Sequence, residues 1–354
     1  MKLKIFLFTL IALLMFNSVS FAAYTKNYKL TAPENNTSLD YTQNVYNEIG
    51  DLKIEVDSTD AEALISADTK IYVKVSYDAK FTNTSDSSQT VAYKLVSGTS
   101  PNVTDLANGG KVEFNFSPAA KNKDFKIGAV ITGDSSGLSD GDYTTGIKFI
   151  GLPVAGQKNY KFGNFTSGDT IVSLDWRVLS VDETNNRALL VTEKAVVKEM
   201  AYHNPSDSSQ RSNKWLTSDV KPFLNGTGDN QFLKGFTAEE KARILKVKID
   251  NATGTKDSDS SAQSKNSSEI VDSSGEDYFF LLSVADANVY FKDDGDRVCR
   301  SLTNNDQCNW WLRSPGNYDY KAAFVGGGGY VSDFGHFVYL TLAIRPAVWI
   351  DLNR

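Results

Sequence analysis

Two-residue alternation of polar and apolar side chains is the feature that most limits how this chain can fold. Residues 70–76 and 111–116 carry an apolar side chain at every second position. That period matches a β-strand with one buried face and does not match the apolar stripe of a helix. Clusters of Ser, Asp and Gly at 85–88 and 133–137 separate such runs. Short strands divided by turn clusters predict an all-β sandwich for residues 23–150, which we interpret as a structural stalk.

The remainder of the chain predicts a second, mixed domain. Residues 151–159 contain Pro153 and two glycines, and we interpret them as a linker. Beyond the linker, residues 160–354 contain two predicted paired strands, 170–180 and 188–194, joined by a polar turn. Two further helices are expected, one over 218–224 and one from an N-cap at Thr237 to Lys248. A strand over 278–283, a short helix or turn over 284–291 and a polar surface loop over 250–275 are also expected.

The first residues have the layout of a secretory signal peptide. Lys2 and Lys4 precede an apolar run from Ile5 to Phe16, and Ser20-Phe21-Ala22 has the small-x-small form of a cleavage site. We predict that residues 1–22 are removed and that the mature protein is extracytoplasmic, secreted or on the cell surface. An uncleaved anchor is the alternative. The apolar run is short for a membrane span, so no membrane insertion is expected after cleavage.

Charge and cysteine content exclude several classes of function. The formal net charge is -6 and no basic stripe occurs, which argues against nucleic acid as a partner. Cys299 and Cys308 are the two cysteines of the chain, and in an exported protein they predict one disulfide. With two distant histidines, His203 and His336, they give no zinc pattern, so we expect no metal and no cofactor.

Four motifs in the second half carry a family resemblance. They are Asp-Trp-Arg-Val-Leu at 175–179, Phe-Leu-Leu-Ser at 280–283, Trp-Trp-Leu-Arg-Ser-Pro-Gly at 310–316 and Ile-Arg-Pro-Ala-Val-Trp at 344–349. This ordered set resembles a bacterial domain of unknown function similar to C-type lectins and to the formylglycine-generating enzyme. The resemblance implies an α+β C-type-lectin-like fold for residues 160–354. Some members resemble the variable proteins of diversity-generating retroelements, in which a reverse transcriptase rewrites adenines in a C-terminal coding stretch.

The last part of the chain shows a spaced frame. The frame positions are Val325, Gly329, Val331, Gly335, Val338 and 343–347, where the valines are expected to point inward and the two glycines to have positive φ. Residues between these positions are expected to point outward and bind a ligand. This predicted display set is Asn317, Tyr318, Asp319, Tyr320, Phe324, Tyr330, Ser332, Asp333, Phe334, His336, Phe337, Tyr339, Leu340 and Thr341.

Both the codons and the amino-acid composition of the display set fit a surface that binds a ligand. Every residue of the display set can be reached from an Asn codon by changing its two adenines. Lys, Glu, Gln, Met and Trp cannot be reached in that way, and none of them occurs from 322 to 342. Tyr and Phe mixed with Gly, Ser and Asp is the mixture that antibody loops use for adaptable contacts. The alternative is that these aromatics are the ordinary core of a C-terminal sheet.

Together these observations predict an adhesin-like ligand-binding protein rather than an enzyme. Its expected partner is a protein or a glycan on another surface. One alternative is a structural surface protein with an invariant lectin-like cap. Another is an oxidase-like enzyme that uses Cys299 and Cys308, although the nearby Asp293, Asp294, Asp296 and Asp306 are expected to raise a thiol pKa there.

Overall fold

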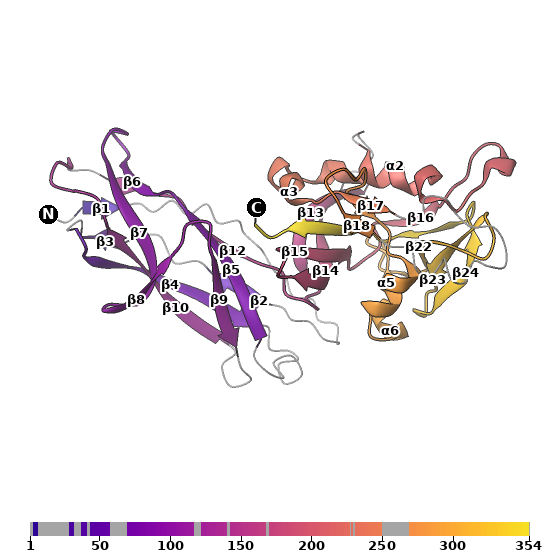
Figure 1. The fold of residues 1–354 in the computed structure, drawn as a ribbon, viewed down its shortest axis with the longest axis horizontal. Coiled ribbons are helices and arrows are strands. Elements are labelled where there is room, and N and C mark those ends of the chain that lie inside the picture. The colour runs from indigo at the N-terminus through magenta and orange to yellow at the C-terminus, as the bar shows by residue number, and fades with distance from the viewer. Residues whose placement is uncertain are drawn as a thin grey trace. The chain divides into compact units, whose positions relative to one another are not determined.

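The computed structural model describes most of the chain. It covers residues 3–5, 28–31, 37–40, 43–56, 69–116, 122–139, 142–167, 170–226, 228, 231–249 and 269–353. Of the predicted signal peptide 1–22, these ranges include 3–5 alone, and of the predicted loop 250–275 they include the part from 269. The chain divides into two compact units, Met1–Val154 (unit 1) and Ala155–Arg354 (unit 2), and the division falls inside the segment predicted as a linker (Figure 1).

Unit 1 is built from two sheets. Its larger sheet has the strand order β2-β4-β10-β7-β6-β11-β1-β3, with β8 paired to β7, and its smaller sheet has the order β12-β5-β9. The strands are β1 (Leu3–Ile5), β2 (Tyr28–Thr31), β3 (Thr37–Leu39), β4 (Tyr46–Val56), β5 (Thr69–Tyr77), β6 (Lys80–Asn83), β7 (Thr90–Thr99), β8 (Asn102–Leu106), β9 (Lys111–Phe116), β10 (Asn122–Ile131), β11 (Tyr143–Thr144) and β12 (Ile147–Gly151).

The core of unit 1 explains the alternation in its sequence. Along β7 and β12 buried residues alternate with partly exposed ones. Val73 and Val75 from the smaller sheet and Phe81 and Leu95 from the larger one belong to a single buried cluster. Two sheets that share one core are the arrangement that the alternating runs predict.

Unit 2 contains two five-stranded sheets, ordered β13-β14-β15-β26-β19 and β16-β25-β22-β23-β24, and two short hairpins, β17-β18 and β20-β21. The strands are β13 (Tyr160–Ser167), β14 (Thr170–Asp182), β15 (Arg187–Thr192), β16 (Val197–Ala201), β17 (Val247–Ile249), β18 (Glu269–Val271), β19 (Phe279–Phe280), β20 (Cys299–Arg300), β21 (Gln307–Cys308), β22 (Trp310–Pro315), β23 (Lys321–Val325), β24 (Val331–Phe337), β25 (Thr341–Ile344) and β26 (Ala347–Asp351).

The helices in the described part of unit 2 are short. They are η1 (Ser208–Gln210), η2 (Trp215–Thr217), α2 (Val220–Asn225), η3 (Phe232–Gly235), α3 (Ala238–Arg243), α5 (Val284–Val289) and α6 (Asp294–Arg297). In the view of Figure 1, α2 and α3 lie on one side of the sheets and α5 and α6 on the other. Strands therefore dominate the described chain, and none of its helices is long and apolar enough to cross a membrane.

Helix ends show where local sequence signals hold. Thr237 caps α3 with a capping box that includes Glu240, as expected, but the helix ends at Arg243 instead of near Lys248. Val247–Ile249 instead forms β17, which pairs with β18. The expected loop over 250–275 is wrong at Glu269–Val271, because these residues form β18 and pair with β17.

A buried ion cluster lies in the core of unit 2. Arg313 is fully buried on β22 and pairs with Glu269 of β18 and, at 2.9 Å, with Asp286 of α5. Its guanidinium also donates to the carbonyl of Leu281 at 2.6 Å. Burial raises the pKa of Glu269 above its usual value, and the charge of Arg313 opposes this shift without cancelling it. One arginine therefore joins β18, β22 and α5 in the interior.

Replacing Arg313 with Met leaves both carboxylates buried without their cation. We expect unit 2 to lose about 3–5 kcal/mol of unfolding free energy. Urea unfolding followed by tryptophan fluorescence measures this loss in unit 2 alone, because all five tryptophans of the chain lie there. Lys198→Met, which breaks the exposed Lys198–Asp306 pair, is the control and should give no measurable change. A similar urea midpoint for Arg313→Met and wild type would contradict the assigned role.

Candidate functional site

The predicted display set lies at the surface of unit 2, on the loop before β23, on β23 and β24, and on the segment that leads into β25. Every member is exposed or half-buried. Tyr330 and Phe334 are 52% and 70% exposed, and Tyr318 and Tyr320 are 39% and 38% exposed. Large aromatic side chains with that much exposure are unusual on a surface that has no partner. The alternative that these residues form the ordinary core of a sheet is wrong for these four side chains.

The frame positions alternate with the display set along the chain and point into the core of unit 2. Val325, Val338 and residues 343–347 are buried, and Val331 packs against the core from a half-buried position. Gly329 and Gly335 have φ values of +89° and +77°, as the spacing predicts. A Cβ at Gly329 would lie 1.6 Å from the carbonyl oxygen of Asp294, so glycine is required there for space as well as for φ.

Two buried polar side chains hold the loops of this surface from beneath. Arg297 of α6 donates from Nε to the carbonyl of Gly329 at 2.8 Å and from Nη1 to the carbonyl of Ala287 at 3.2 Å. Asn213 donates from Nδ2 to the carbonyls of Tyr318 and Lys321 at 2.9 and 3.0 Å. These bonds reach the backbone of the loops, so the loop shape does not depend on the side chains that the loops present.

Stacked rings form a row across the surface. The rings of Tyr318 and Tyr320 have centroids 5.3 Å apart with planes 5° from parallel, and Tyr320 and Phe337 are 5.9 Å apart at 10°. Tyr339 continues the row, 5.5 Å from Phe337. Rings in contact restrain one another, so the row presents aromatic edges and hydroxyl groups in a fixed arrangement.

A second group of rings joins this row. Phe324 lies 6.2 Å from Tyr330 edge to face and 5.6 Å from His336, and His336 is 6.3 Å from Phe337. Phe334 is the most exposed aromatic of the set. We call this surface the aromatic face, and its rings are Tyr318, Tyr320, Phe324, Tyr330, Phe334, His336, Phe337 and Tyr339.

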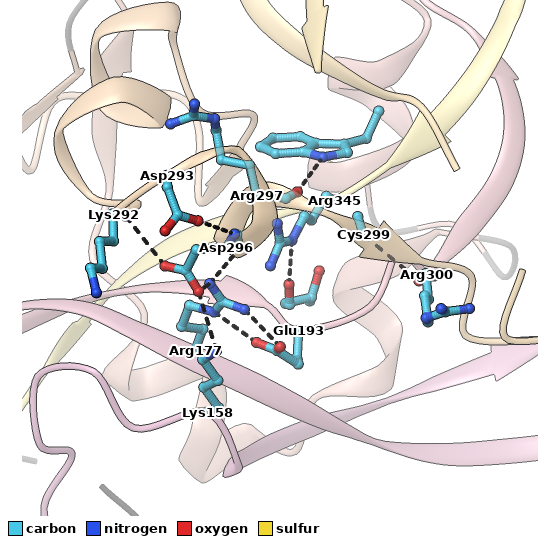
Figure 2. Close-up of polar contacts among 12 residues, drawn as sticks. Lys158, Arg177, Glu193, Lys292, Asp293, Asp296, Arg297, Cys299, Arg300 and Arg345 are labelled. Carbon is cyan, nitrogen blue, oxygen red and sulfur yellow. Dashed lines mark hydrogen bonds and ion pairs between the residues drawn. The ribbon is translucent and has the colours of Figure 1, made fainter. Parts of the chain in front are cut away.

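A charged cluster fixes α6, the helix that carries Arg297. Figure 2 shows Arg177 of β14 between Glu193 and Asp296. Arg177 binds Glu193 through two bonds of 2.8 Å and Asp296 through another of 2.8 Å, while Lys158 lies 3.2 Å from Asp296. Burial alone would raise the pKa of Asp296, but the charges of Arg177 and Lys158 outweigh burial, so its pKa lies below the usual value.

Arg345 is the second fully buried arginine. Its Nε donates to the carbonyl of Thr192 at 2.8 Å, and its guanidinium lies over the rings of Trp310 and Phe291 at 5.0 and 5.2 Å. Its two terminal nitrogens have no hydrogen-bond partner among the described residues. Arg313 and Arg345 are both fully buried, and Arg345 contacts aromatic rings where Arg313 contacts carboxylates.

Cys299 and Cys308 face each other on β20 and β21 as free thiols, so the disulfide predicted from the sequence is not formed in the structure. Their exposed fractions are 1% and 7%. The Cys308 thiol donates to the carbonyl of Cys299 at 3.5 Å, and the Cys299 thiol to that of Arg300 at 3.7 Å. The hairpin therefore satisfies both thiols in their reduced form.

The environment of the thiols differs from the sequence-based expectation. A hydrogen bond with Cys308 lowers the pKa of Cys299 to about 7, and the charge of Arg345 acts in the same direction against burial. Burial and Glu193 act to raise the pKa of Cys299, and the Cys299 thiol and burial raise that of Cys308. The four neighbouring aspartates contact other groups. Asp293 caps α6, Asp294 binds Arg297, Asp296 binds Arg177 and Asp306 binds Lys198.

No group of three or more His, Cys, Asp or Glu side chains in the described ranges is arranged to hold a metal ion. Residues 185–352 match the model of a family described as a domain of unknown function, DUF6273. No curated protein and no solved structure matches the chain. The DUF6273 segment contains the whole aromatic face together with Arg297, Arg313 and Arg345.

Sequence reasoning missed three contributors to this surface. Arg211 lies with its guanidinium carbon 4.0 Å from the ring centroid of Tyr339, and Asn213 holds the loop around Tyr318. Both occupy a polar stretch without periodicity, more than 100 residues before their partners. Lys321, which lies over the rings of Tyr318 and Phe337, is outside the predicted display set.

Substitution of Gly329 by Ala tests the frame. The positive φ is expected to cost about 1–3 kcal/mol, and the clash with Asp294 adds to that cost, so the urea midpoint of unit 2 should fall. Gly328→Ala is the matched control, because a Cβ at Gly328 has no atom within 4 Å and its φ is not positive. Equal midpoints for the two variants would show that the turn is not constrained.

The loss of folding stability of unit 2 at low pH should depend on Asp296. A carboxyl group with a lowered pKa in the folded state stabilises the fold above its unfolded pKa of about 3.9 and loses that contribution as pH falls further. We expect wild-type unit 2 to lose stability from about pH 5 downward. Asp296→Asn should be less stable at pH 7 and should show a shallower decline. Urea midpoints between pH 7 and pH 3 measure both, and parallel curves would contradict the assignment.

Proposed function

We propose that this chain is an exported binding protein whose unit 2 presents the aromatic face to a protein or glycan on another surface. One observation supports the proposal more than any other. Side chains of several chemical types are exposed along residues 317–341. The residues between them are buried, are glycines or are held by hydrogen bonds of their backbone. A rigid backbone with exposed aromatic side chains is the usual construction of a recognition surface.

The composition of the face suits binding. Tyr, Phe and His supply large contact area with few rotatable bonds, and Ser332, Asp333 and Thr341 add polar contacts beside them. Residues of this kind dominate the binding energy of protein interfaces when they lie near the centre of the contact. The exposed rings of Tyr330 and Phe334 are the candidates for that central role.

The proposal includes two further features. We assign unit 2 to a C-type-lectin-like fold, which the resemblance of its motifs supports, and unit 1 to a sandwich that serves as a stalk. We also propose that a retroelement diversifies the display set, since each of its residues is reachable from an Asn codon through adenine changes. The coding DNA tests this second feature. A near-identical downstream repeat with adenines at these codons and a nearby reverse-transcriptase gene are expected, and absence of both favours an invariant cap.

Binding itself is tested with Phe334→Ala and Tyr330→Ala. Ligands are first selected for the wild-type protein from a displayed dodecapeptide library and from an oligosaccharide array. We expect each variant to bind them at least about tenfold more weakly, because truncating a hot-spot aromatic costs about 2 kcal/mol or more. The urea midpoint should change little, since Phe334 and Tyr330 are 70% and 52% exposed and Tyr330 adds only an edge contact with the ring of Phe324.

Ile171→Ala is the matched control, because Ile171 is a 71% exposed apolar residue of β14 outside the display set. It should leave affinity unchanged. Equal affinities for Phe334→Ala, Tyr330→Ala and Ile171→Ala would contradict the proposed face, as would the absence of any ligand for the wild-type protein in both selections.

A further inference from the structure

Two cations lie on the rings of the aromatic face. The guanidinium carbon of Arg211 is 4.0 Å from the ring centroid of Tyr339. The ammonium nitrogen of Lys321 is 5.2 Å from the centroid of Tyr318 and 5.1 Å from that of Phe337. Cation–π contact at these distances holds each charge in place without neutralising it.

Neither cation forms an ion pair with any described residue. By contrast, the cations beneath the face, Arg177, Arg297 and Arg313, each bind a carboxylate of the same unit. Without carboxylate partners, the terminal N–H groups of Arg211 and the ammonium group of Lys321 are left for a group outside the chain, while Nε of Arg211 is buried.

The stacking within the row bears on the class of ligand. A neutral sugar binds an aromatic side chain by laying its C–H groups on an open ring face. Here Tyr318 and Phe337 share their ring faces with Tyr320 and with the ammonium group of Lys321, and Arg211 covers a face of Tyr339. Within this row the ring edges, the hydroxyl groups and the two cations remain, and these groups suit the carboxylates of a protein better than a neutral glycan. Phe334 and Tyr330 lie outside the row and offer apolar contact beside it.

We propose that the ligand is an acidic protein segment whose Asp or Glu carboxylates bind Arg211 and Lys321 while its apolar side chains contact Phe334 and Tyr330. The planar guanidinium of Arg211 suits bidentate binding of a carboxylate, and its position on Tyr339 reduces the conformational entropy lost on binding. Asp319 lies on the same surface and repels other carboxylates, so the charges also restrict where the acidic groups of the ligand approach. This inference rests on the proposed function of the face.

The test uses the full chain and a displayed library of random dodecapeptides. We expect peptides selected on the wild-type protein to be enriched in Asp and Glu relative to the starting library. Arg211→Gln combined with Lys321→Gln should weaken binding of a selected peptide at least about tenfold, equivalent to about 1.4 kcal/mol. Replacing the acidic residues of that peptide with Asn and Gln should weaken its binding to wild type similarly, and the two losses should not add.

Lys214→Gln is the matched control, because Lys214 is an exposed cation of the same segment as Arg211 and lies over no ring of the face. Its affinity should stay within about twofold of wild type, which separates specific contacts from an effect of net charge. Urea midpoints of all variants check that the fold is retained.

The outcomes separate the two proposals. Selected peptides that are neutral or basic, and that bind the double variant as well as wild type, overturn the acidic-ligand inference. If Phe334→Ala still weakens those peptides, the proposed function stands without it. Oligosaccharides that bind the wild-type protein when no peptide does also overturn the inference, because the partner is then a glycan. Peptides that bind wild type, the double variant and Phe334→Ala equally overturn both.

Discussion

The backbone of the aromatic face is fixed by hydrogen bonds from buried side chains beneath it. Arg297 reaches the carbonyl of Gly329 from α6, and Asn213 reaches the carbonyls of Tyr318 and Lys321 from a segment far away in the sequence. The bond from Arg297 satisfies the Gly329 carbonyl, whereas the bonds from Asn213 give a second donor to carbonyls that already accept from the backbone N–H groups of Lys321 and Gly316. Because the bonds involve backbone oxygens, the loop shape depends on groups that the surface does not present.

Arg297 is itself held by neighbours. The carbonyl of Arg297 accepts from the indole nitrogen of Trp310 at 3.2 Å, and Asp296 beside it binds Arg177 and Lys158. These contacts connect β14, α6, β22 and the turn before β24. Charges with low exposure and several partners are rigid, because breaking one contact leaves a desolvated ion. These rigid contacts lie beneath the aromatic face and do not involve the side chains that the face presents.

Local signals in the sequence were sufficient for features that local physics determines. The two-residue alternation predicted the strands of unit 1, and the N-cap signal at Thr237 predicted the start of α3. The spacing of Gly329 and Gly335 predicted positive φ at both. Features set by distant contacts were not accessible. Residues 269–271 pair with β17 inside an expected loop, and Glu269 binds Arg313 44 residues away. The aspartates near Cys299 in sequence cap α6 or bind cations instead. The sequence shows which residues are charged, but the groups that they bind are determined by the fold.

The ring of Tyr330 lies directly over Gly326, where an added Cβ would come within 2.2 Å of it. Gly326 therefore leaves room for the ring at position 330, and any side chain at position 326 would require that ring to turn away. The direction in which Tyr330 projects from the surface thus depends on the absence of a side chain four residues earlier.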